Sequence, residues 1–316
     1  MTSNYYRLLF KLAISFLLIG YLVFKLDWAV IVTMLTTIDF IIYMVSTVLL
    51  LALVFLNSTK FYLFLKGTPI KKSIAFLMKV NCIGRFYALF VPSGIGRGVV
   101  RWYKVTENRT NRVYFLAVSL FERLIHVFLL LILGLIPLFV YSSNEKIFVL
   151  RDSIWPIIVI CLLLTLFGVG YFLFPFFQFA INRMVIWFLP ARLKGENTTI
   201  FFRNFSLQNI TVITFLGIFF ADVLWLFVFI VRTFLLSKSM GLPLNYIDIA
   251  WMSSLVLLLQ IIPISFAGIG LREGAFAYLM TVFGLAPENG ASLGILFFSQ
   301  MLIVALIGGL LELAEK

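Results

Sequence analysis

Charged side chains are scarce in this chain of 316 residues. Only 12% of the residues are Asp, Glu, Lys or Arg, whereas 63% are hydrophobic. An ordinary soluble domain carries about 25% charged residues, so the composition excludes that class. Several apolar runs reach the roughly 20 residues that a helix needs to cross the hydrocarbon core of a bilayer. The sequence therefore predicts an all-α polytopic protein, a single membrane domain over residues 1–316, in the cell membrane.

Cysteine and histidine are also rare, with two Cys residues and one His. Cys82 and Cys161 lie far apart in apolar surroundings, which favours buried free thiols over a disulfide framework or a metal site. The lone His126 does not make a metal site by itself. We therefore expect no metal and no cofactor.

The motifs of several enzyme classes are missing. The chain has no GxxxxGK[ST] stretch, which excludes an ATP motor of the P-loop type, and no HExxH, serine nucleophile elbow or aspartate-rich pair. These absences argue against a membrane hydrolase or transferase, and we expect no catalytic residue. A net charge of +12 is compatible with nucleic-acid binding, but the basic residues lie between apolar runs, where the positive-inside rule accounts for them. We expect no nucleic-acid partner.

Six apolar segments predict full membrane spans, at residues 8–25, 38–60, 113–141, 154–176, 208–236 and 291–312. No small-x-small cleavage site precedes Lys25, so we expect a retained first span and a loop over 1–37.

The charges between the spans predict the orientation. Eleven basic residues and one acid lie from Lys60 to Arg112, which is typical of a cytoplasmic stretch. Segment 142–153 balances its charges and predicts an outer loop, whereas the more basic segment 177–207 predicts an inner one. Both termini are then expected in the cytoplasm.

Two further apolar regions are interrupted, 73–105 by VPSGIGRG and 247–284 by PISFAGIGLREG. Each predicts a re-entrant hairpin, in which a proline ends the first half-helix and glycines form the turn. Irregular backbone at that depth is tolerated only where protein or a water-filled cavity shields it from lipid. We expect a polar cavity lined by the tip residues Pro92, Gly94, Gly96, Pro263, Gly268 and Gly270.

The two interrupted regions have similar surroundings. The span before each carries a basic residue near its end, Lys60 or Arg232, and the span after each carries a polar pair, Glu122-Arg123 or Ser299-Gln300. This pattern predicts two repeats, over 38–141 and 208–312, joined by the lone span 154–176. One crossing between the repeats makes them inverted, so the first hairpin enters from the cytoplasm and the second from outside.

Arginines beside the glycine turns predict an anion site. A half-helix that begins after such a turn points unpaired N–H groups at the cavity, and Arg97 and Arg272 add full charges there. The alternatives are that Arg272 pairs with Glu273 and that Arg97 snorkels to the headgroups. Arg101 either extends the site or is one more cytoplasmic charge.

Further polar residues lie deep in the predicted spans, with Glu122, Arg123 and His126 in the third and Asp222 midway along the fifth. Glu122 and His126 share a helix face, so they are candidates for headgroup binding or for a proton relay. The alternative for Glu122 is a structural ion pair with an arginine at a hairpin tip. The same two interpretations apply to Asp222.

Two stretches resemble the signatures of a known family. PISFAGIGLREGAF, and FVPSGIGRGVVRWY followed by FERL at 121–124, are similar to motifs of the lysylphosphatidylglycerol synthase transmembrane family, which includes the flippase part of multiple peptide resistance factors. The resemblance spans nearly the whole chain and implies a domain that moves phospholipid-type substrates, such as aminoacylated phosphatidylglycerol, between leaflets. The matching positions are Pro92, Gly94, Gly96, Arg101, Glu122, Arg123, Pro263, Gly268, Gly270, Arg272 and Glu273.

The chain departs from that family at Arg97, where an acid often follows the glycines, and this favours an anionic headgroup. The soluble aminoacyl-transferase domain of larger relatives has no counterpart in the sequence, so we expect a membrane lipid made by a separate enzyme as the substrate. We expect a lipid flippase or scramblase with Arg97, Arg101 and Arg272 on the phosphate. A transporter of a small soluble anion and a membrane-embedded lipid-modifying enzyme remain alternatives, and a homo-oligomer remains open.

Overall fold

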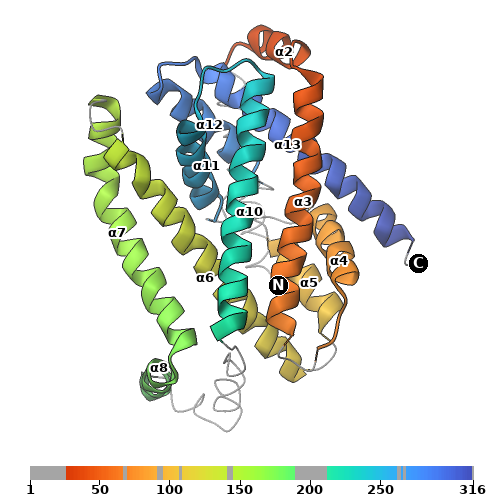
Figure 1. The fold of residues 1–316 in the computed structure, drawn as a ribbon, viewed down its shortest axis with the longest axis vertical. Coiled ribbons are helices and arrows are strands. Elements are labelled where there is room, and N and C mark those ends of the chain that lie inside the picture. Colours follow the sequence, from red (N-terminus) through yellow and green to blue (C-terminus); the bar gives the residue numbers. More distant parts are fainter. Residues whose placement is uncertain are drawn as a thin grey trace, which may run out of the picture.

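Every regular element in the described part of the chain is a helix (Figure 1). The computed structural model describes residues 26–66, 70–90, 95–106, 109–140, 145–188, 212–261, 265 and 268–314. The long helices are α3 (Phe40–Leu65), α6 (Arg109–Val140), α7 (Glu145–Leu173), α10 (Val212–Ser239) and α13 (Pro287–Leu313). The shorter ones are α2 (Trp28–Thr36), α4 (Ile74–Tyr87), α5 (Ile95–Val105), α8 (Pro175–Phe188), α11 (Tyr246–Ile261) and α12 (Leu271–Val282).

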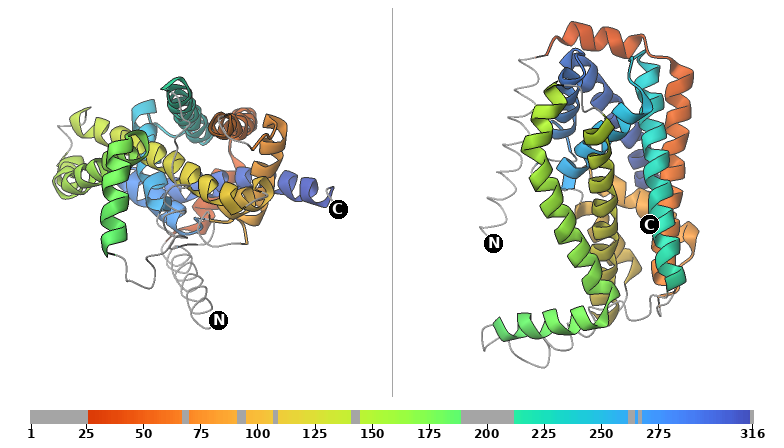
Figure 2. Two further views of the ribbon diagram at one scale, coloured as in Figure 1. Left: turned by 90° about the horizontal axis from the view of Figure 1, so that it is seen from below. Right: turned by 60° about the vertical axis from the view of Figure 1, so that its left-hand side comes forward.

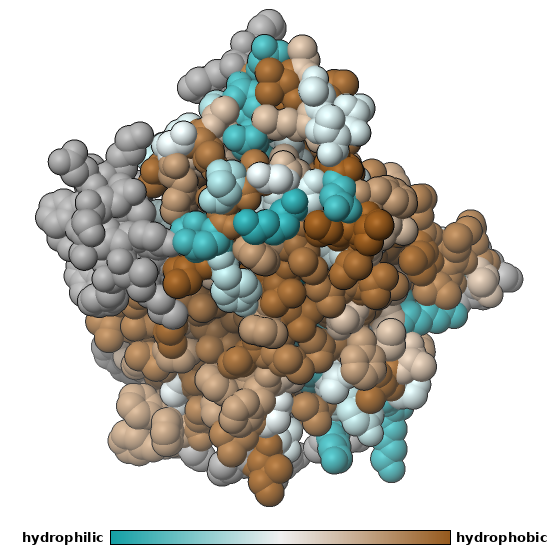
Figure 3. Space-filling model, turned by 45° about the horizontal axis from the view of Figure 1, so that its top comes forward, coloured by the Kyte–Doolittle hydropathy of each residue, from teal (hydrophilic) through white to brown (hydrophobic). Residues whose placement is uncertain are grey.

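Five described segments are long and apolar enough to cross a membrane: Phe40–Leu65, Ala117–Leu135, Pro156–Leu173, Ile213–Ser239 and Pro287–Leu313. They agree with five of the six predicted spans, and the remaining one, 8–25, lies outside the described residues. Apolar side chains cover most of the lower flank in Figure 3, whereas hydrophilic ones gather on the end that the view brings forward. The chain is an integral membrane protein.

Two segments outside the predicted spans are partly helical. Helix α7 begins at Glu145, inside the segment 142–153, and α8 occupies the start of the segment 177–207. The helices extend beyond the predicted spans, and the side of the membrane on which each segment lies stays a prediction. A helix can continue into the headgroup region, where water and lipid headgroups solvate its charges. Figure 2 shows α2 lying across one end of the long helices and α8 across the other.

The two interrupted regions are pairs of short helices, α4 with α5 and α11 with α12. These four helices have between 11 and 16 residues. At about 1.5 Å per residue, none reaches the roughly 30 Å of a hydrocarbon core. Figure 1 shows α4 and α5 toward one end of the bundle and α11 and α12 toward the other. Pro92, Gly94 and Pro263 lie outside the described residues, and Gly96 lies in the first turn of α5.

The second break depends on glycine. Gly268 and Gly270 have φ angles of 77° and 79°, in the left-handed region that residues with a Cβ atom rarely adopt. The Glu273 carboxylate caps the start of α12, because its Oε2 accepts a hydrogen bond of 2.7 Å from the Gly270 amide. Backbone conformation and side-chain capping together begin α12 at Leu271.

Helices α3 and α10 pack closely along each other, and both contribute to the two main clusters of buried apolar residues. Helix α4 packs on α13, and α11 packs on α6. Helix α4 also contacts α3, and α11 also contacts α10.

Gly308 allows α13 to approach α4 closely. A Cβ atom at this position would overlap the backbone carbonyl of Cys82. We expect Gly308→Ala to force the helices apart and to lower the free energy of unfolding by about 1–3 kcal/mol, as overpacking does. The thermal unfolding midpoint of the purified protein in detergent measures this effect. Gly134→Ala is the matched control, because its nearest neighbour, Ser254 Oγ, would be 3.9 Å from the new Cβ. Equal midpoints for the two variants would show that the close approach is wrong.

Candidate functional site

Five ionisable side chains from four helices meet inside the bundle: Lys60 of α3, Arg101 of α5, Glu122 and His126 of α6, and Asp222 of α10. We call this group the ion cluster. The close packing of α3 along α10 brings Lys60 next to Asp222 although 162 residues separate them in the sequence.

Lys60 bridges two carboxylates. Its Nζ atom lies 2.6 Å from Asp222 Oδ1 and 3.2 Å from Glu122 Oε1. The exposed fractions of Lys60, Glu122 and Asp222 are 4%, 7% and 0%. Moving each such ion out of water costs several kcal/mol, so the charges are tolerable only while they remain paired.

Arg101 and His126 extend the network. Arg101 Nη1 lies 3.5 Å from Glu122 Oε2 and 3.4 Å from Asn57 Oδ1, and its guanidinium lies over the Phe61 ring. His126 Nδ1 is 3.3 Å from Asp222 Oδ1. The Lys60 and Arg101 cations therefore balance the charges of the two carboxylates.

The ion cluster retains unused hydrogen-bonding capacity. Arg101 Nε and Asp222 Oδ2 are buried, and neither has a hydrogen-bond partner within the described part of the chain. The same holds for Nε1 of Trp225, whose ring packs edge-on against His126. Buried polar atoms normally have partners, so two donors and one acceptor in or beside the cluster can receive a polar ligand.

The cluster unites four of the predicted site residues: Arg101, Glu122, His126 and Asp222. Glu122 pairs with Lys60 and with Arg101, which lies one turn beyond Arg97, whereas its pairing with an arginine at a hairpin tip stays a prediction. Arg123 is not a member, because its side chain is exposed and its Nη2 donates to the Ile261 carbonyl at the end of α11, 2.9 Å away. Arg97 lies in α5, and its side chain is outside the described part of the structure.

Arg272 and Glu273 form a separate buried ion pair. Glu273 Oε1 lies 2.5 Å from Arg272 Nη2 and 3.0 Å from its Nε. The guanidinium also lies over the Phe298 ring. The pairing predicted as the alternative for Arg272 is therefore present, and a ligand on Arg272 stays a prediction.

Sequence reasoning missed Lys60. It assigned this lysine to the cytoplasmic stretch that follows the second span, but α3 continues past it to Leu65 and buries its side chain. The apolar stretch FYLFL directly after Lys60 could have indicated that the span continues, because a solvated loop rarely contains five apolar residues in a row.

A second polar group, also missed as a site, lies between α3, α10 and α13. Arg232 donates from Nε and Nη2 to Gln300 Oε1, and Gln300 Nε2 contacts Ser46 and Thr47. We call these four residues and Tyr43, whose carbonyl also accepts from Gln300, the arginine–glutamine site.

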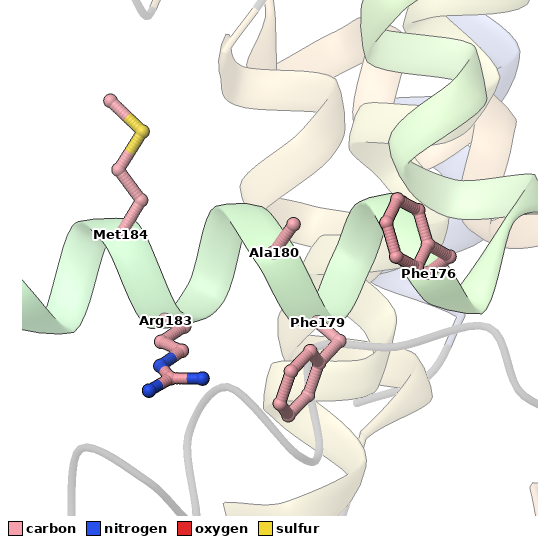
Figure 4. Close-up of a pocket in the computed structure, with 5 residues that line it drawn as sticks. All are labelled: Phe176, Phe179, Ala180, Arg183 and Met184. Carbon is pink, nitrogen blue, oxygen red and sulfur yellow. The ribbon is translucent and has the colours of Figure 1, made fainter.

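Figure 4 shows a pocket along α8, lined by Phe176, Phe179, Ala180, Arg183 and Met184. All five residues lie on this one helix, and none belongs to the predicted site. Within the described residues, no group of three or more His, Cys, Asp or Glu side chains could hold a metal ion.

Comparison with known proteins gives one match. The sequence model of one family, described as the lysylphosphatidylglycerol synthase TM region, matches residues 8–309. No curated protein and no solved structure matches the chain.

Proposed function

Because the chain belongs to the lysylphosphatidylglycerol synthase transmembrane family, we propose that it moves a phosphate-bearing lipid between the two leaflets of the cell membrane. The ion cluster carries this proposal. A charged network buried among apolar spans is costly, and its unused donors and acceptor suit a polar headgroup.

The chemistry of the ion cluster fits a lipid headgroup in two ways. Lys60 and Arg101 can donate to phosphate oxygens, as ammonium and guanidinium groups commonly do. Glu122 and Asp222 can accept from a hydroxyl or amine of the headgroup. The lipid tails would remain in the bilayer while the headgroup exchanges for the internal ion pairs.

We infer that the chain consists of the inverted repeats predicted from the sequence. Reciprocal packing supports this inference, because α4 contacts α13 and α11 contacts α6. In addition, the basic residue of each leading span contacts the polar pair of its own closing span: Lys60 binds Glu122, and Arg232 binds Gln300. Repeats of this kind can rock against each other and open a central site to either side.

The remaining features of the proposal come from the sequence-based predictions. The cytoplasmic end is the basic one, with both termini on that side, and a separate enzyme makes the lipid. The protein acts as a transporter and not as an enzyme. Transport runs down a lipid gradient or uses protons carried by Glu122 and His126.

Reconstitution into liposomes tests the proposal. We expect the purified protein to make fluorescent phosphatidylglycerol in the inner leaflet accessible to an external quencher faster than in empty liposomes. Sealed vesicles from the same preparation should take up no radiolabelled phosphate. Phosphate uptake without lipid movement would instead support a transporter of a soluble anion.

A further inference from the structure

Arg232 is a buried cation without a bonded carboxylate among the described residues. Its side chain is 2% exposed, and it lies in the membrane span formed by α10. Its guanidinium contacts the side-chain carbonyl oxygen of Gln300 and the face of the Phe297 ring, whose centroid is 4.3 Å from the guanidinium carbon. Neither partner carries a negative charge.

Gln300 is held so that it can only accept from Arg232. Its amide Nε2 lies within hydrogen-bond distance of three acceptors: Ser46 Oγ at 2.5 Å, Thr47 Oγ1 at 3.0 Å and the Tyr43 carbonyl oxygen at 3.3 Å. Since these contacts use the amide nitrogen, the Oε1 atom faces the guanidinium. The Nε and Nη2 atoms of Arg232 share this acceptor, and Nη1 has no hydrogen-bond partner in the described part of the structure.

The buried acid Glu273 is already bonded to another arginine, Arg272. Glu273 neutralises Arg272 through the buried ion pair, so it does not offset the charge of Arg232. The arginine–glutamine site is therefore electropositive, unlike the ion cluster.

The two sites lie at different depths of the same helix. Asp222 and Arg232 are ten residues apart in α10, which corresponds to about 15 Å along the helix axis. Helix α3 contributes to both sites, with Lys60 at one and Ser46 and Thr47 at the other.

We propose that the arginine–glutamine site binds a phosphate-type oxyanion. An arginine fork binds phosphate through parallel charge-assisted hydrogen bonds, and a bound anion would supply the missing counter-charge. The assignment of that phosphate to a translocated lipid rests on the proposed function, whereas the oxyanion chemistry does not.

Binding to the purified full-length protein in detergent tests this proposal. The probes are short-chain phosphatidylglycerol, diacylglycerol with the same chains, and inorganic phosphate. We expect phosphatidylglycerol to bind the wild type and to bind Arg232→Gln about tenfold to a hundredfold more weakly. Arg183→Gln on the surface of α8 removes the same charge and should bind as the wild type does. Diacylglycerol should not distinguish the three proteins.

Gln300→Glu provides a second test that does not remove the buried cation. The new carboxylate would pair with Arg232, so the variant should fold, unfold at an equal or higher temperature, and lose phosphatidylglycerol binding. If both Arg232→Gln and Gln300→Glu fold and bind phosphatidylglycerol and phosphate as the wild type does, the proposal is overturned.

The other outcomes separate the two proposals. Binding of inorganic phosphate that depends on Arg232, without binding of phosphatidylglycerol, would support the oxyanion site and overturn its assignment to a lipid. Lipid binding that depends on Arg232, in a protein that moves no lipid in liposomes, would support this site and contradict the proposed function.

Discussion

Replacing Lys60 with methionine is expected to abolish lipid translocation and to lower the free energy of unfolding by about 3–5 kcal/mol. Lys60 is the only side chain that contacts both Glu122 and Asp222 among the described residues. Methionine has a similar length but no charge, so the two carboxylates would remain buried with too little positive charge. The headgroup would also lose a principal phosphate donor.

A double variant separates the two effects. The double variant Lys60→Met/Asp222→Asn removes one charge of each sign. Its unfolding midpoint should therefore return most of the way to that of the wild type. Translocation should not recover, because the headgroup ligands are still missing. The thermal midpoint and the translocation rate should be measured on the same preparations. A double variant that translocates at the wild-type rate would mean that the ion cluster is only structural.

Glu273→Gln is expected to have the second largest effect, again about 3–5 kcal/mol of stability. The variant leaves the Arg272 guanidinium buried without its carboxylate. It also weakens the acceptor that caps Gly270 at the start of α12. The unfolding midpoint in detergent measures the loss.

The matched variant is Arg272→Met/Glu273→Gln, which removes both charges of the pair. It should be more stable than Glu273→Gln alone, since no unpaired buried charge remains. If Glu273→Gln unfolds at the wild-type temperature, the buried pair does not exist in the folded protein.

Much of the fold could be predicted because a bilayer permits few structures. Each span must satisfy its backbone hydrogen bonds internally, so long apolar runs indicate helices, and five of the six predicted spans have counterparts among the described helices. The helix ends were harder to predict. The charge of Lys60 suggested an end to the second span, but a partner on another helix allows the helix to continue through it.

The candidate site was partly predictable for the same reason. Placing Glu122, His126 or Asp222 inside a membrane costs free energy, so each was a candidate site residue on sequence alone. Arg123 was included because it is a charge deep in the same predicted span and part of the FERL motif. Adjacent residues on a helix point about 100° apart, however, and its side chain bonds to the Ile261 carbonyl and not to the cluster.

Two features required the three-dimensional structure. Lys60 bonds to Asp222 although the two residues are distant in the sequence. A single sequence does not indicate which buried charges pair with each other. The burial of Arg232 beside neutral groups depends on how α3, α10 and α13 pack, which hydropathy alone does not determine.

The most direct test of the central claim is the rate at which fluorescent phosphatidylglycerol crosses liposome membranes that contain equal amounts of the wild type, Lys60→Met/Asp222→Asn or Arg183→Gln. If the ion cluster binds the headgroup, the wild type and Arg183→Gln should move the lipid at equal, fast rates. The double variant should move it no faster than empty liposomes do. A wild type that is no faster than empty liposomes, or a folded double variant that is as fast as the wild type, would contradict the claim.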